Sequence, residues 1–158
     1  MASSLIGLHA LIGEVGIFLF IWAFIEMRNI SPQKVDFVKR LVAFGTFLFF
    51  LSWILGGYYY VDVYGSEIKP VIKEGPRPWA HSIIMETKEH LFLFLPFISL
   101  ASFFFIRRYR DILGTPKGAD AQKAILILLG ISIVIGILMI IFGYLVSAGF
   151  DSAVGGSL

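Results

Sequence analysis

The hydrophobic residues divide the chain into four long apolar runs that are separated by shorter polar segments. The runs cover residues 5–26, 38–58, 82–106 and 122–148. About 20 mainly apolar residues are the length that an α-helix needs to cross the hydrocarbon core of a bilayer. The pattern therefore predicts an all-α integral membrane protein, an antiparallel four-helix bundle that forms a single transmembrane domain over residues 1–158.

Turn-forming residues mark the expected helix ends. Ser31 followed by Pro32 is typical of a helix start, because serine caps a first turn and proline fits within it. Gly56 and Gly57 are predicted to end the second helix. The segment GTPKGAD at 114–120 separates the third helix from the fourth.

Composition supports a membrane location and narrows the chemistry. The chain is 58% hydrophobic and 15% charged, whereas about a quarter of the residues in a typical soluble domain are charged. The chain has no cysteine, which excludes disulfides, thiolate metal ligands, iron–sulfur clusters and covalent c-type haem. The apolar composition makes the lipid bilayer the expected environment. No pattern of a nucleic-acid-binding module is present, so a nucleic acid is not expected as a partner.

The basic residues predict the orientation, because lysine and arginine concentrate in cytoplasmic loops. The segment 28–40 holds four of them, 107–123 holds five, and the longer 57–80 loop holds three. Both termini and the 57–80 loop are therefore expected on the outer side of a plasma or inner membrane. The tyrosines and Trp79 of this loop predict an ordered outer cap at the headgroup level.

Glu14 and His9 are unusual because they lie within the first apolar run. An ionisable group at the bilayer centre costs at least about 2.5–3.5 kcal/mol, so such residues face a protein interior and mark candidate sites. At about 100° per residue, His9, Gly13 and Gly16 share one stripe. Another helix packing into this glycine trough is one interpretation, and a flat cofactor with His9 as its ligand is the other.

The third run begins with HSIIMETKEH at 81–90. Counting back about 20 residues from its inner end places His90 at the depth of His9, with Glu86 one turn earlier on the same face. His81 is expected nearer to water. Lys88 and Glu89 are expected to face the lipid headgroups and are assigned no role.

The first and third helices of an antiparallel four-helix bundle lie diagonally, so their inward side chains converge on its axis. This convergence predicts one site in the outer half of the membrane, formed by His9, Glu14, Glu86 and His90. Two histidines at matched depth suit bis-imidazole ligation of a non-covalent haem b, with Gly13 and Gly16 beneath the macrocycle. His81 is the alternative to His90 as the ligand from the third helix. The leading interpretation is therefore a small b-type haem protein that takes part in electron transfer, an oxidoreductase or a subunit of one.

Three other interpretations remain open. Two histidines and two glutamates also suit non-haem iron, manganese or zinc, although the Glu86–His90 spacing is one residue longer than the Glu-x-x-His motif of diiron bundles. Glu14 and His9 would alternatively handle protons or bind a quinone. The chain would also serve as a structural subunit of a larger membrane complex, or as a homo-oligomer, with the polar groups holding helices together.

Overall fold

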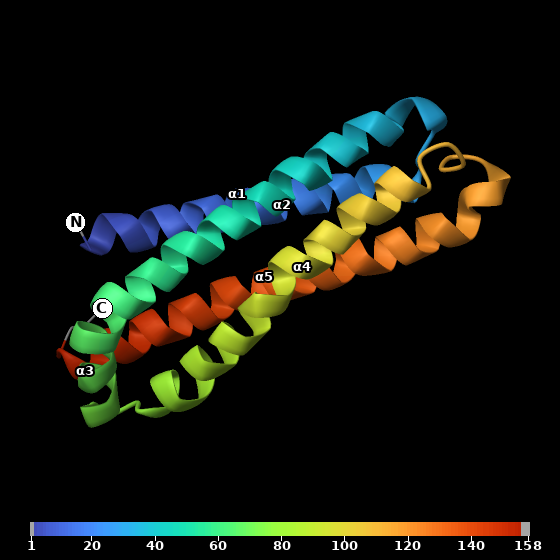
Figure 1. Cartoon of the computed structure of the whole chain (residues 1–158). Coiled ribbons are helices and arrows are strands. Elements are labelled where there is room, and N and C mark those ends of the chain that lie inside the picture. Colours follow the sequence, from blue (N-terminus) through green and yellow to red (C-terminus); the bar gives the residue numbers. More distant parts are fainter. Residues whose placement is uncertain (1, 156–158) are drawn as a thin grey trace.

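The computed structural model describes the backbone of residues 2–155 and the side chains of residues 4–155, and this part of the chain is helical without strands (Figure 1). Four long helices account for most of it. They are α1 (Ala2–Arg28), α2 (Val35–Tyr59), α4 (Glu86–Arg108) and α5 (Ala119–Ala153). The shorter elements are η1 (Pro32–Lys34), the π-helical η2 (Tyr60–Ile68), α3 (Lys69–Glu74), the π-helical η3 (Ala80–Met85) and η4 (Pro116–Gly118).

The four long helices form an antiparallel bundle in which α1 packs against α2 and α5, and α4 packs against the same two helices. Helices α1 and α4 are therefore diagonal, as the sequence predicts. Figure 1 shows the N-terminus, the C-terminus and α3 at one end of the bundle, here called the cap end. The connections α1–α2 and α4–α5 lie at the other end, here called the basic end because of their lysines and arginines.

Glycine and phenylalanine fix the close approach of α1 to α2. A Cβ atom on Gly16 would lie 2.8 Å from Cε1 of Phe49, and one on Gly45 would lie 2.8 Å from the ring of Phe20. Without a difference in polarity between lipid and side chain, membrane helices associate through such close packing. The stripe that contains Gly16 is thus filled by α2, which supports the packing interpretation of that part of the trough.

The bundle is solid towards its basic end. Side chains from all four long helices are fully buried there and belong to one core cluster, which includes Phe20, Met27, Val38, Ile106, Ile125 and Leu129. The outward faces carry large apolar side chains instead, such as Phe18, Phe47, Ile54 and Ile127. Each of the four long helical stretches is long and apolar enough to cross a membrane, so the fold is compatible with a membrane helical bundle.

Gly56 and Gly57 do not end α2, so the prediction of that boundary is wrong. The helix continues to Tyr59 and then widens into the π-helical η2 before α3. A glycine inside a helix costs only about 0.5–1 kcal/mol relative to alanine, which packing readily offsets. The segment 57–80 is thus mostly helical, and its Tyr64, Ile72 and Ala80 form a second buried cluster with Val146 of α5.

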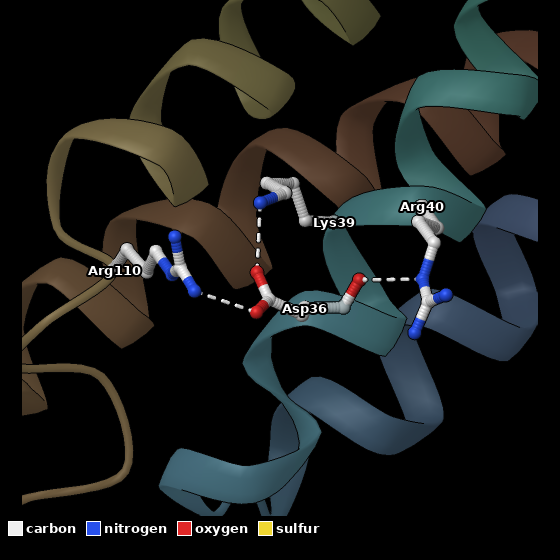
Figure 2. A network of polar contacts seen from close by, with 4 residues as sticks. All are labelled: Asp36, Lys39, Arg40 and Arg110. Atoms are coloured by element: carbon white, nitrogen blue, oxygen red, sulfur yellow. Dashed lines mark hydrogen bonds and ion pairs between the residues drawn. The ribbon is translucent and has the colours of Figure 1, made fainter.

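At the basic end, one carboxylate joins two connections of the bundle (Figure 2). Asp36, in the first turn of α2, accepts contacts of 2.7 Å from Nζ of Lys39 and 2.7 Å from Nη2 of Arg110, which lies between α4 and α5. Nε of Arg40 donates to the backbone oxygen of Asp36 over 3.3 Å. These groups are partly exposed, and such pairs contribute at most about 1 kcal/mol.

Candidate functional site

At the cap end of the bundle, an open cavity of about 720 Å³ lies between all four long helices and η2. Ligand pockets in proteins typically measure about 300–1,000 Å³. Most of the lining is apolar or small, and the polar exceptions include His9, Glu14, Lys88, Glu89 and Tyr144. A large apolar cavity with a few polar groups is the arrangement that favours an amphipathic ligand.

His9 is held in one orientation by α2. Its Nδ1 lies 2.8 Å from the backbone oxygen of Ser52 and 3.0 Å from Ser52 Oγ, and that hydroxyl donates to the backbone oxygen of His9 over 3.0 Å. A carbonyl oxygen can only accept, so Nδ1 carries the proton in this bond. In the neutral ring Nε2 is then the nitrogen with a free lone pair, as in histidines that bind metals.

Gly56 makes room for this ring. A Cβ atom on Gly56 would lie 2.7 Å from Cε1 and 2.8 Å from Nδ1 of His9, distances that real Cβ contacts do not reach. The edge of the ring also meets Phe92 of α4, with ring centroids 6.0 Å apart and planes at 87°. The imidazole is therefore positioned by both α2 and α4.

Glu14 and Gly13 line the same cavity as His9, although Glu14 lies about 140° around the helix axis from His9. The cavity is therefore wide enough for side chains on two different faces of α1 to line it. Gly13 also faces α2, because a Cβ atom there would lie 3.2 Å from Ser52 Oγ. Of the predicted site residues, the structure thus brings together His9, Gly13 and Glu14.

His90 and Glu86 do not share this cavity, so the single site predicted from His9, Glu14, Glu86 and His90 is not assembled. Both side chains are exposed, and Nδ1 of His90 lies 2.6 Å from the backbone oxygen of Glu86. The reason is helix phase: Phe92 faces His9, and a residue two positions away lies about 200° around the axis. The depth assigned to His90 does not decide which way it faces.

Lys88, and not His90, lines the cavity from the first turns of α4. It lies four residues before Phe92, and such a spacing keeps two side chains on one helix face. Lys88 and Glu89 both line the cavity, which contradicts the expectation that they face only the headgroups. The signal that would have found Lys88 is its stripe with Phe92 and Leu95, which runs down the inner face of α4.

His81 occupies a separate position in the cap. It is 2% exposed, and its Nδ1 lies 3.1 Å from the hydroxyl of Tyr64. His81 lies at the cap end, but its side chain is buried within the protein. Burial follows from η3, which packs against α5 and carries His81 and Ala80 into the contact.

Within the described residues, no three histidine, aspartate or glutamate side chains come close enough to hold a metal ion. The proposed iron, manganese or zinc site of His9, His90, Glu14 and Glu86 is therefore absent from this arrangement. Helix phase separates the ligands again, because α4 directs Glu86 and His90 away from the α1 pair.

Comparison of the chain with protein-family models, with curated proteins and with solved structures gave no match.

Proposed function

We propose that this protein binds haem b in the cap-end cavity through Nε2 of His9 and serves electron transfer in a membrane. The observation that carries the proposal is the 2.8 Å contact between His9 Nδ1 and the Ser52 backbone oxygen. Ligating histidines commonly donate their other ring nitrogen to a carbonyl oxygen, which fixes the tautomer and raises the basicity of the free nitrogen. His9 meets that condition beside a cavity of suitable size.

The lining supports a flat, apolar macrocycle. Phe92, Leu95 and Ile140 are among the apolar side chains that line the cavity, and the chain offers no thiolate, so the haem would be non-covalent. Met85 and Met139 also line the cavity, and methionine accompanies histidine as an axial ligand in some cytochromes. Either methionine is a candidate second ligand in place of His90.

We further propose that the cap end faces the outer side of a plasma or inner membrane. The excess of lysine and arginine at the basic end supports this orientation. The site would then exchange electrons with partners at the outer face, including a larger membrane complex.

The visible spectrum of the purified protein tests the haem proposal. We expect a Soret band after expression with haem supplementation, its loss in His9→Gly, and its partial recovery when imidazole is added to that variant. His81→Ala and His90→Ala are matched controls that should keep the band, because neither residue lines the cavity. A wild-type protein that stays colourless, or a band that depends on His90 rather than His9, would contradict the proposal.

Binding of a quinone is the second candidate, and Glu14 favours it. The carboxyl lies in the first membrane helix and lines the cavity together with His9 and Lys88. Quinone oxygens exchange hydrogen bonds and protons with such groups. Extraction of a quinone from the colourless protein, with loss of that quinone in Glu14→Gln, would support this candidate over haem.

A further inference from the structure

Lys88 is a cationic residue of the cavity that haem ligation by His9 would not explain. It stands in the first turn of α4, between Thr87 and Glu89, which are both exposed, whereas Lys88 itself is partly buried. A long lysine near a helix end usually extends to the headgroups. Here the side chain lines the cavity instead.

The ammonium of Lys88 reaches across the bundle to α5. A Cβ atom on Gly143 would lie 3.5 Å from its Nζ, so the glycine leaves an ordinary contact distance for the charge. The ammonium therefore lies at the cavity wall between α4 and α5, and on the same cavity as His9.

Among the described residues, the ammonium of Lys88 has neither an ion pair nor a hydrogen bond. The four ion pairs of this part of the chain involve Lys34, Lys39, Arg110 and Lys123. Glu14 and Glu89 line the same cavity, yet neither carboxylate forms an ion pair with the Lys88 ammonium. A partly buried cation without a partner is costly, and a bound anion removes that cost.

We infer that Lys88 makes the cavity a site for an amphipathic ligand whose head carries a negative charge. The apolar body lies among the helices, and a carboxylate of the head accepts hydrogen bonds from the ammonium. The propionates of haem supply this chemistry if the proposed function, on which that source rests, is correct. A fatty acid supplies the same chemistry without haem.

The haem source is tested with haem b and its dimethyl ester, in which both carboxylates are neutral. We expect Lys88→Met to weaken haem binding about tenfold, the size of one charge-assisted hydrogen bond, and to leave the affinity for the ester unchanged. Lys88→Arg should retain most of the preference for haem over the ester. Lys73→Met, which removes an exposed lysine of the cap, is the matched control and should change neither affinity.

The fatty-acid source is tested by fluorescence, because Trp53 lines the cavity while Trp22 and Trp79 are exposed. In a Trp22→Phe, Trp79→Phe background, dibromostearic acid should quench Trp53 at lower concentration than its methyl ester does. Lys88→Met should abolish that difference. This arm gives a result even when the protein binds no haem, so failure of the haem proposal and failure of this inference are distinguishable. Equal affinity for acid and ester in both arms, or an equal loss of both in Lys88→Met, would overturn the inference.

Discussion

His9 is the residue on which the candidate site depends, and three neighbours decide what it can do. Ser52 bonds to Nδ1, Gly56 leaves space for the ring, and Phe92 packs against the ring from α4. Two of these neighbours lie on α2, so the position of the imidazole is set by the contact between α1 and α2. A change in that contact should therefore alter ligand binding without touching the ligand.

Gly56→Ala should reduce ligand binding, while Gly57→Ala should not. The new Cβ atom at Gly56 would lie 2.7 Å from Cε1 of His9, whereas one at Gly57 would meet nothing within 4 Å. The ring must move away from Ser52, at a cost of about 1–3 kcal/mol for such overpacking. We expect a several-fold lower Soret absorbance per protein and a lower melting temperature for Gly56→Ala in detergent. Equal values for the two variants would show that the ring is not confined.

The sequence predicts the fold well and the site only in part, and helix phase explains the difference. Hydrophobic runs reveal the lengths of the helices, and counting along them gives depth. Neither reveals which side of α4 faces the bundle, because two residues of error turn a side chain about 200° around the axis. The structure therefore has Lys88 rather than His90 in the cavity beside His9 and Glu14. The burial of His81 depends on π-helical turns in η3, for which the sequence gives no distinct pattern.

At the scale of elements, the cap is attached to α5 by contacts between very small residues. A Cβ atom on Gly149 would lie 2.5 Å from Cβ of Ala80, and one on Gly75 would lie 2.5 Å from Cβ of Ala153. Such spacing lets η3 and the end of α3 lie directly on the α5 backbone. The position of Tyr64, which lines the cavity from η2, depends on this attachment.

Gly149→Ala should loosen the cap, and Gly130→Ala on the same helix is its control. The first substitution meets the methyl group of Ala80, whereas a Cβ atom at Gly130 would lie 3.8 Å from Cε2 of Phe24, an ordinary contact. We expect Gly149→Ala to lower the free energy of unfolding by about 1–3 kcal/mol. Gly130→Ala should be neutral, or should stabilise the protein by up to about 1 kcal/mol through helix propensity.

Thermal melting and limited proteolysis measure these effects. Faster cleavage in the 57–80 segment of Gly149→Ala, with unchanged cleavage in Gly130→Ala, is the expected pattern. A Gly149→Ala protein as stable and as resistant as wild type would mean that the cap contributes little to stability.

At the scale of the whole molecule, the bundle has two chemically different ends. Lysine and arginine gather at the connections of the basic end, and the cavity and both chain termini lie at the other. The basic residues and the cavity therefore lie at opposite ends of the long axis of the bundle. The orientation of that axis in a membrane decides which compartment a ligand in the cavity faces.

Cysteine labelling tests the orientation. Val154→Cys lies at the exposed end of α5, and Lys117→Cys lies at an exposed position of η4 at the opposite end. Since the natural chain has no cysteine, an impermeant maleimide on intact cells should label the first variant and spare the second until the membrane is opened. The reverse pattern would turn the cavity towards the cytoplasm.

The solid core at the basic end has a consequence for energetics in a charged membrane. The cavity does not continue through the bundle as a channel, because the fully buried side chains of Phe20, Met27 and Leu129 fill the space between the helices towards the basic end. A charge that enters the cavity crosses only a fraction of the transmembrane electric field. Moving one elementary charge across the whole field is worth about 2.3 kcal/mol per 100 mV. If the bundle spans a membrane, binding and release of a charged ligand in the cavity should therefore respond only weakly to the membrane voltage.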